Sequence, residues 1–427
     1  MDQALFTTPT FGAPTSALHH ILTGSFRSLS LALLAFSPLN KTLQLVQSVD
    51  VPEDAPGPYQ YIALNPGRNR AYTTTWAWPP KLISWEIDRG GGNDEEWGVS
   101  FLNSVPITAT SSYTVIPHPY THIYSMGGPT GEVHEISPAG AFGSKIQEVL
   151  FVPGDQLESA DKTRVALRYG SHGVEFSSAL SRAFVPVLGT DTIEMYSHNP
   201  QTGKLVHIFT SRSPRGADAH DGPRHVKIHP NGRILYSVTE HSNYVDIYEI
   251  TEASVIYLAS VSLIPEELRS NSGSFRGDTL LLAPSSEKHP APIALFATTR
   301  GDNENINGWV SAIKLDKEGK LSLSADSLPS IQHYEMPTSG GKAHAIDLLS
   351  KTHETGPSDG LWIVLTDDSD AASLAERGRG GGVRILEWNG WNGTEGLKTV
   401  ASWPGAPGSS NQESQWYSGG SHAVWLD

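Results

Sequence analysis

The 427-residue sequence contains no cysteine. Disulfide bonds, thiol nucleophiles and thiolate metal sites are therefore excluded. Amphipathic helical periodicity is also almost absent, which argues against a helical protein. The most apolar run near the start, residues 29–39, is too short to span a bilayer and follows no basic leader. We therefore expect neither a signal peptide nor a membrane anchor, and a cytoplasmic location is the default expectation.

Positive charge is scarce as well. Lysine and arginine number 30 against 45 acidic residues, which gives a formal net charge of −15, and no basic cluster stands out. We expect neither nucleic acid nor an anionic membrane as a partner. A chain this acidic binds an anionic small molecule only if arginines converge locally on one site.

What the sequence does contain is a repeated strand pattern, clearest in residues 218–250. Three short runs of alternating polar and apolar residues, 224–228, 233–240 and 244–250, are separated by turn-forming residues at 229–232 and 241–243. Three antiparallel strands cannot bury a core alone. The unit is therefore predicted to be repeated and stacked.

Six such units follow one another along the chain, and a seventh is split between the two ends. Residues 19–49 supply its later strands, and residues 420–426 supply its first strand. The sequence thus predicts an all-β, seven-bladed β-propeller whose last blade is closed by both termini. We expect residues 1–18 to form a flexible N-terminal arm and residues 19–427 to form a single propeller domain.

The first strand of each blade lines the central channel of a propeller, so equivalent positions on successive blades converge. Chemically useful residues stand at these positions: His172, Arg224, Arg276, Lys342, His344 and His422. The ends of the second strands carry Glu240, Arg300, Asp367 and Asp368. The coincidence of several such residues at equivalent positions predicts one site at the channel.

Two arginines beside histidine and glutamate suit a carboxylate substrate. Guanidinium groups pair bidentately with carboxylates and stay charged, and histidine or glutamate transfers a proton near neutral pH. Each residue taken alone also has a structural interpretation. His172 can satisfy a backbone group, Arg224 can brace a neighbouring blade, and Asp367 with Asp368 favour turn and capping roles.

Motifs for other chemistries are missing. The sequence contains no HExxH or paired-histidine spacing, so we expect no metal, and it contains no GxSxG nucleophile elbow. No cofactor is expected.

Several short segments carry a resemblance to a known family. Residues 222–225 (GPRH), 228–233 (IHPNGR) and Glu240 resemble the lactonase-type seven-bladed propellers, which include bacterial 6-phosphogluconolactonases and fungal 3-carboxy-cis,cis-muconate lactonizing enzymes. Residues 19–24, 172–173, 338–341, 366–368 and 423–427 are more similar to the fungal branch.

The resemblance implies an activity and a set of site residues. The expected activity is a cofactor-free cycloisomerase that closes 3-carboxy-cis,cis-muconate, a small polycarboxylate of aromatic catabolism, to its lactone. The implied catalytic residues are His172, Arg224, Arg276 and Glu240, with Arg224, Arg276, Lys342, His344 and His422 expected to bind substrate. Lys342 and His344 depart from the histidine and asparagine expected there, which leaves the exact substrate open.

Two questions remain open at this point, the identity of the general acid and the function itself. The general acid is His172 with Glu240 as its orienting partner, or it is Glu240 itself. A lactone hydrolase of the 6-phosphogluconolactonase type would use the same cations. A non-catalytic propeller that binds proteins is the third interpretation, although the Trp-Asp repeat signature of scaffolding propellers is missing. The sequence predicts no oligomeric state.

Overall fold

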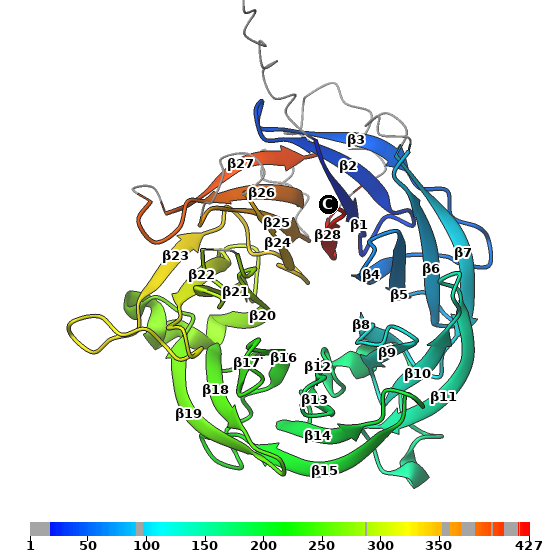
Figure 1. Cartoon of the computed structure of the whole chain (residues 1–427), viewed down its shortest axis with the longest axis horizontal. Coiled ribbons are helices and arrows are strands. Elements are labelled where there is room, and N and C mark those ends of the chain that lie inside the picture. Colours follow the sequence, from blue (N-terminus) through cyan, green and yellow to red (C-terminus); the bar gives the residue numbers. More distant parts are fainter. Residues whose placement is uncertain are drawn as a thin grey trace, which may run out of the picture.

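A computed structural model describes residues 18–90, 97–286, 288–351, 359–368, 381–393, 396–404, 417 and 419–427. Within these ranges, 28 strands form seven four-stranded antiparallel sheets around a central channel (Figure 1). This confirms the predicted all-β seven-bladed propeller. The predicted N-terminal arm lies outside the described residues, apart from residue 18.

Each sheet runs from an inner strand beside the channel to an outer strand at the edge of the ring. The first three blades in chain order are β4 (Tyr59–Leu64), β5 (Arg70–Thr75), β6 (Lys81–Asp88) and β7 (Gly98–Pro106); β8 (Ser111–Val115), β9 (His122–Gly127), β10 (Thr130–Ile136) and β11 (Phe142–Leu150); and β12 (Glu175–Ser177), β13 (Arg182–Val187), β14 (Thr192–His198) and β15 (Leu205–Arg212). The next three are β16 (Pro223–Ile228), β17 (Ile234–Thr239), β18 (Tyr244–Ile250) and β19 (Val255–Ser262); β20 (Phe275–Leu282), β21 (Ala294–Gly301), β22 (Trp309–Lys314) and β23 (Ile331–Glu335); and β24 (Ile346–Ser350), β25 (Leu361–Asp367), β26 (Gly382–Trp388) and β27 (Leu397–Trp403).

The remaining blade joins the two ends of the chain, in the order β28 (Ala423–Trp425), β1 (His19–Thr23), β2 (Ala32–Ser37) and β3 (Thr42–Ser48). Ile21 pairs with Trp425 and Thr23 pairs with Ala423 in the antiparallel ladder. The backbone N–H of Leu426 also donates to the carbonyl of His20 at 2.8 Å. The predicted closure of the last blade by both termini is therefore confirmed.

The turn between β16 and β17 shows how local sequence fixes a strand pair. Gly232 has a φ of +71°, a conformation that glycine adopts without a steric penalty. Its N–H donates to the carbonyl of His229 at 2.8 Å, and the N–H of His229 donates to the carbonyl of Ile234 at 2.9 Å. This tight turn sets the register that carries Arg224 and Glu240 to the same end of the two strands.

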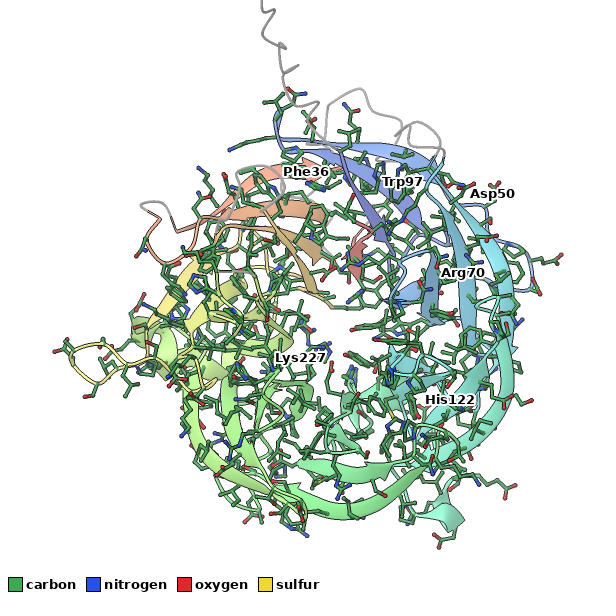
Figure 2. All side chains as sticks on the ribbon, in the orientation of Figure 1. Phe36, Asp50, Arg70, Trp97, His122 and Lys227 are labelled. Atoms are coloured by element: carbon green, nitrogen blue, oxygen red, sulfur yellow. The ribbon has the colours of Figure 1, made fainter. Side chains whose placement is uncertain are left out.

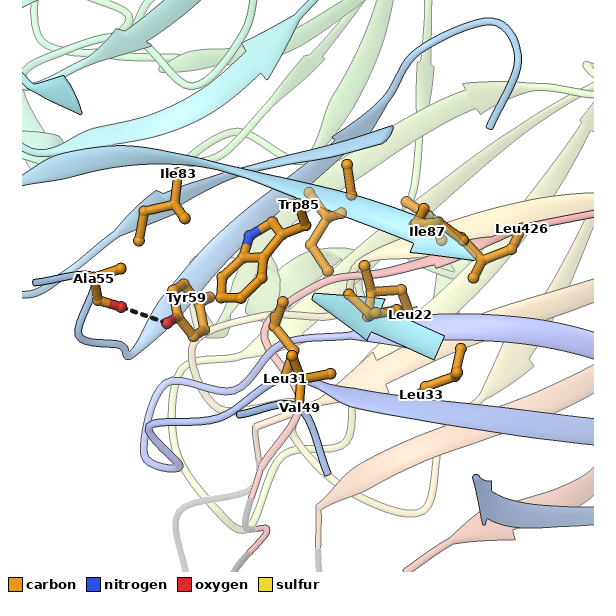
Figure 3. Packing of buried hydrophobic residues seen from close by; sticks show 14 residues of the cluster. Leu22, Leu31, Leu33, Val49, Ala55, Tyr59, Ile83, Trp85, Ile87 and Leu426 are labelled. Atoms are coloured by element: carbon orange, nitrogen blue, oxygen red, sulfur yellow. Dashed lines mark hydrogen bonds between the residues drawn. The ribbon is translucent and has the colours of Figure 1, made fainter. Parts of the chain in front are cut away.

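The hydrophobic core lies between neighbouring blades. In Figure 3, Leu22 and Leu33 from the closing blade pack against Tyr59 and Trp85 from the next blade, and all four side chains are fully buried. The Tyr59 hydroxyl donates to the carbonyl of Ala55 at 2.6 Å, which satisfies its polar end inside this core. Such interfaces hold the seven blades at fixed angles around the channel.

Helix is confined, within the described residues, to short 3₁₀ segments: η2 (Gly154–Gln156), η3 (Arg164–Arg168) and η4 (Glu266–Ser274). None of the described helices has the length and apolar character needed to cross a bilayer. Thr163 caps η3, and its side-chain oxygen accepts the N–H of Val165 at 3.3 Å. This short helix contributes directly to the site described next.

Candidate active site

One end of the central channel opens into a cavity of about 380 Å³, within the range of small-molecule sites. Its described lining includes five cationic side chains and a single carboxylate, that of Glu240: Arg164, Arg168, Arg224, Arg300 and Lys342 are the cations. The surplus of positive charge contrasts with the net charge of −15 on the whole chain. The cavity therefore meets the requirement that arginines converge where an anion binds.

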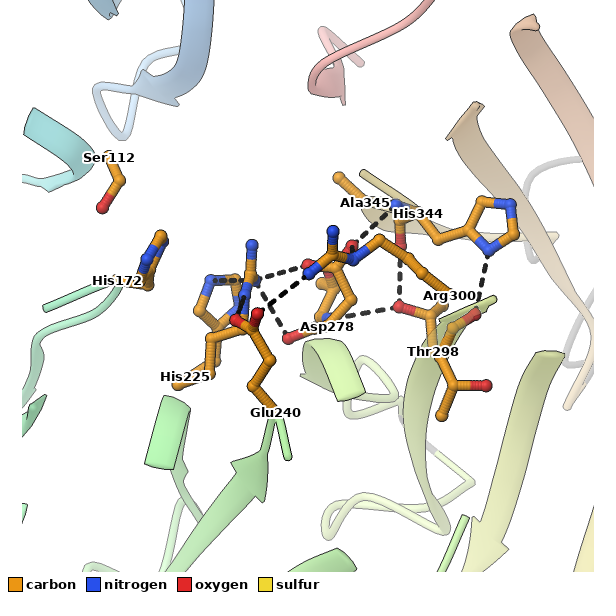
Figure 4. A network of polar contacts seen from close by, with 12 residues as sticks. Ser112, His172, His225, Glu240, Asp278, Thr298, Arg300, His344 and Ala345 are labelled. Carbon is orange, nitrogen blue, oxygen red and sulfur yellow. Dashed lines mark hydrogen bonds and ion pairs between the residues drawn. The ribbon is translucent and has the colours of Figure 1, made fainter. Parts of the chain in front are cut away.

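The floor of the cavity is a cluster of two arginines and two carboxylates, shown in Figure 4. Arg224 lies 3.1 Å from the Glu240 carboxylate and 2.5 Å from the Asp278 carboxylate. Arg300 lies 3.3 Å from Glu240 and 3.2 Å from Asp278. Each carboxylate thus bridges both guanidinium groups and fixes their positions.

Backbone contacts between blades place this cluster. The N–H of Glu240 donates to the carbonyl of Gly222 at 2.7 Å, and its carbonyl accepts the N–H of Gly277 at 2.9 Å. A Cβ at position 277 would lie 2.2 Å from the carbonyl oxygen of Thr239, so only glycine allows β20 to approach the end of β17 this closely. The neighbouring blades therefore meet at Glu240.

The electrostatic environment keeps Glu240 ionised. Burial alone would raise the pKa of this carboxyl, but the guanidinium groups of Arg300 and Arg224 lower it to about 2. The pKa of Arg300 is correspondingly raised, because Asp278 and Glu240 outweigh the opposing effect of burial. Glu240 is consequently an ionised anchor for two arginines and a poor proton donor at neutral pH.

His172 lies across the cavity from this cluster (Figure 4). Its Nε2 donates to the carbonyl of Leu167 in η3 at 2.9 Å, since a carbonyl oxygen only accepts. That bond selects the neutral tautomer with an unprotonated Nδ1. Burial, and next the charge of Arg224, lower the pKa of His172 to about 4, so the ring is neutral at pH 7. The orienting partner of His172 is thus Leu167, whereas the sequence suggested Glu240.

Arg276 and His344 do not line the cavity. The guanidinium group of Arg276 donates to the carbonyls of Gly273 and Phe275, both at 2.8 Å. The fully buried imidazole of His344 donates from Nδ1 to the carbonyl of Thr299 at 3.0 Å. The structure thus separates both residues from the group with which the sequence placed them.

Lys342 lines the main cavity, whereas His422 does not. Lys342 lines the cavity, with its ammonium group 3.4 Å from Asp368. His422 lines a connected chamber of about 20 Å³, which has room for about one water molecule. Burial, and next the charge of Lys227, lower the pKa of His422 to about 3. His422 therefore lies beyond the space that a substrate in the main cavity would fill.

Asp367 and Asp368 are fully buried, where the sequence suggested turn and capping roles. Asp368 lies 3.0 Å from Arg27 as well as near Lys342, and Asp367 lies 3.3 Å from Arg384. Both carboxylates therefore compensate cations near the closing blade.

Sequence reasoning missed three charged residues of the site and gave a fourth, Arg300, no role in substrate binding. Arg300 was recognised at the end of a second strand, the position equivalent to Glu240, but the role of second arginine was given to Arg276. Asp278 carries an available signal, because it follows Arg276 by two residues on the same inner strand, β20. Arg164 and Arg168 lie in η3, a five-residue segment with no periodic pattern to indicate its position.

A separate polar group lies further along the channel. Figure 2 shows Lys227 directed toward the centre of the ring. Its ammonium group pairs with Glu175 and lies 3.3 Å from the hydroxyl of Tyr113. Burial would lower the pKa of Lys227, but Glu175 and Tyr61 raise it, so the lysine stays charged.

Among the residues that the structure describes, no group of three or more histidine, aspartate or glutamate side chains is arranged to hold a metal ion.

Comparison with known proteins relates this arrangement to others. Residues 27–320 match the family described as lactonase, seven-bladed β-propeller. The chain is 31% identical over 361 residues to muconate cycloisomerase 1 of Cutaneotrichosporon cutaneum, covering 83% of this chain and 88% of that protein. It is 22% identical over 373 residues to carboxy-cis,cis-muconate cyclase of Neurospora crassa, covering 83% and 90% of the two chains. The periplasmic gluconolactonase of Pseudomonas aeruginosa has a TM-score of 0.67 at 15% identity, covering 96% and 99%, a likeness of fold alone.

Proposed function

This chain belongs to the lactonase family of seven-bladed β-propellers, and we propose that it is a cycloisomerase that closes 3-carboxy-cis,cis-muconate to 3-carboxymuconolactone. The observation that carries the proposal is the surplus of cationic side chains around a cavity in a chain of net charge −15. The names of the two fungal relatives, a muconate cycloisomerase and a carboxy-cis,cis-muconate cyclase, support the choice of substrate.

The proposed reaction needs no redox partner. An oxygen of one substrate carboxylate adds to a conjugated alkene carbon, so a C–O bond forms and the alkene π bond breaks. The displaced electron pair spreads into the neighbouring carboxylate as an enolate-like dianion. A proton then adds to the α-carbon, and each turnover takes up one proton from solution.

Arg224 and Arg300 suit the stabilisation of this developing charge. Both guanidinium groups line the cavity, and both are held in place by Glu240 and Asp278 before any substrate arrives. Preorganised charges of this kind lose little energy to reorganisation as the transition state forms. They also hold a flexible dienoate in an orientation from which the ring closes.

His172 is the proton donor in this proposal. Burial and Arg224 lower its pKa, so a polyanionic substrate beside it acts in the opposite direction and favours the imidazolium. Glu240 is ionised between two arginines and anchors them, so it has no proton to give at neutral pH. Of the two assignments that the sequence left open, the geometry favours His172.

The proposal is tested by incubating the protein with 3-carboxy-cis,cis-muconate and following the diene absorbance together with the net uptake or release of protons. We expect loss of absorbance with uptake of one proton per molecule. Hydrolysis of a lactone would release a proton, so the sign of the proton change distinguishes the cyclase from a lactone hydrolase. Failure to convert any muconate, with 6-phosphogluconolactone hydrolysed, would refute the proposed function.

A further inference from the structure

The cations on the cavity floor are already compensated. Arg224 and Arg300 share the carboxylates of Glu240 and Asp278, two positive charges against two negative ones. Lys342 faces Asp368. Arg27 shares the Asp368 carboxylate, so each of these cations is paired with a carboxylate of the protein before substrate binds.

The uncompensated charge lies at the mouth of the cavity, on η3. Arg164 and Arg168 both line the cavity and are both exposed. Neither forms an ion pair with any residue that the structure describes. Two guanidinium groups without carboxylate partners among the described residues, at the edge of this cavity, form a site that attracts an anion.

Packing fixes the position of Arg164. The Arg164 guanidinium lies over the ring of Trp76, 5.1 Å from its centroid, and the Trp76 indole N–H donates to the Gln60 side chain. Trp76 also contacts Phe26, with 4.2 Å between the ring centroids. Arginine held over an aromatic face keeps its N–H groups free for carboxylate oxygens.

The same short helix also orients His172. Leu167, between the two arginines, accepts the hydrogen bond from His172 Nε2. Ala166 is buried against Gly128, where an added Cβ would lie 3.0 Å from the Ala166 side chain. A carboxylate bound to η3 is therefore held in a fixed relation to the imidazole.

We propose that Arg164 and Arg168 form a rim subsite that binds a second carboxylate of the substrate and selects polycarboxylates over monocarboxylates. The identity of the substrate rests on the function proposed above, whereas the rim subsite itself is measured by binding alone. Trp76 is a positioning residue for Arg164. The deeper arginines then act on the reacting carboxylate and the rim subsite anchors another.

The test uses two non-reacting probes, propane-1,2,3-tricarboxylate and butyrate, in calorimetric titrations at low salt. We expect Arg164→Ala/Arg168→Ala to weaken tricarboxylate binding about tenfold, since each exposed ion pair contributes a factor of a few. Butyrate binding should change less than about twofold. Arg164→Ala/Arg168→Lys should recover part of the loss, because the charge at position 168 remains while the planar fork is gone.

Arg233→Ala is the matched control. Arg233 is an exposed arginine in the β16–β17 turn, at the opposite end of those strands from Arg224 and Glu240. Arg233→Ala therefore removes half of the charge that the double variant removes, at a position that does not face the cavity. A loss of tricarboxylate affinity as large in this control as in the double variant would overturn the proposal. So would the absence of any tricarboxylate binding by the unmodified protein.

Kinetics supply a second measurement if muconates are turned over. The double variant should raise KM for 3-carboxy-cis,cis-muconate with kcat unchanged, because the rim subsite binds ground and transition states alike. An unchanged KM would contradict the subsite. If no muconate reacts but tricarboxylate binding still depends on both arginines, the rim subsite stands and the proposed reaction fails.

Discussion

Arg276 and Arg300 are directly paired in the ladder between β20 and β21, yet only Arg300 lines the cavity. Arg300 pairs with Glu240 and Asp278, whereas Arg276 donates to backbone carbonyls of its own segment. The ladder is shifted between Gly277 and Leu280, so regular strand alternation does not hold at this point. Two arginines in register with each other therefore have different environments.

Because only one of these two arginines lines the cavity, replacing each by alanine should have different effects on activity. Arg300→Ala should lower kcat/KM for 3-carboxy-cis,cis-muconate by about 100-fold or more, as expected when a preorganised charge is removed. Arg276→Ala should change it by less than about threefold, because its guanidinium group does not line the cavity. The initial rate of diene loss measures both. Equal losses of kcat/KM in the two variants would show that Arg276 acts in the active site.

Asp278 should matter for stability as well as activity. It is 1% exposed, bridges both arginines and accepts the N–H of His344 at 2.7 Å. Asp278→Asn leaves two buried guanidinium groups with one carboxylate, so we expect a loss of about 3 kcal/mol in the free energy of unfolding. Urea denaturation measures it.

The matched control for this variant is Asp359→Asn, which removes a carboxylate 3.0 Å from the half-exposed Lys288. It should cost less than about 1 kcal/mol, because exposed ion pairs contribute little. A similar loss of unfolding free energy in both variants would show that the buried cluster contributes no more to stability than an exposed ion pair.

The pH dependence of turnover reports on His172. Its pKa is about 4 in the free protein, so the protonated fraction falls as pH rises above that value. If His172 donates the proton, kcat/KM should fall about tenfold for each pH unit between pH 6 and pH 8. His172→Ala should lose about 100-fold or more in rate and show a flat profile. A flat profile in the unmodified protein would exclude His172 as the acid.

Buried neutral histidines should weaken the fold in acid. The pKa of His172 is about 4 and that of His422 about 3, both lowered chiefly by burial from the ordinary value near 6.5. As pH falls below 6.5, the unfolded chain binds protons that the folded chain excludes, so stability falls down to the folded-state values. We expect a loss on the order of 2 to 4 kcal/mol between pH 7 and pH 5.

Urea titrations at pH 7, 6 and 5 check this expectation. In His422→Gln, one titrating group is removed. The slope of the unfolding free energy against pH should therefore correspond to about one fewer proton taken up on unfolding. Equal unfolding free energies across this pH range would show that these imidazoles accept protons freely in the fold.

Local signals account for the parts of the site that the sequence predicted. The turn at residues 229–232 and the alternation of the strands beside it place Arg224 and Glu240 at one strand end, as the structure confirms. Arg300 was placed with Glu240 at the end of a second strand, but no local signal indicates that its side chain, and not that of Arg276, pairs with Glu240 and Asp278. η3 was missed because five residues of 3₁₀ helix carry no periodicity.

The sequence alone determined the seven-fold repetition of strands and the closure of the ring by both ends, because alternation and turn residues act over a few neighbouring positions. The tertiary structure decided which side chains share the channel, since residues such as Asp278 and Arg168 meet there only through packing between blades. It also decided their charge states. The pKa values of Glu240 and His172 move in the same direction for different reasons, the first through two neighbouring guanidinium groups that outweigh burial and the second chiefly through burial itself.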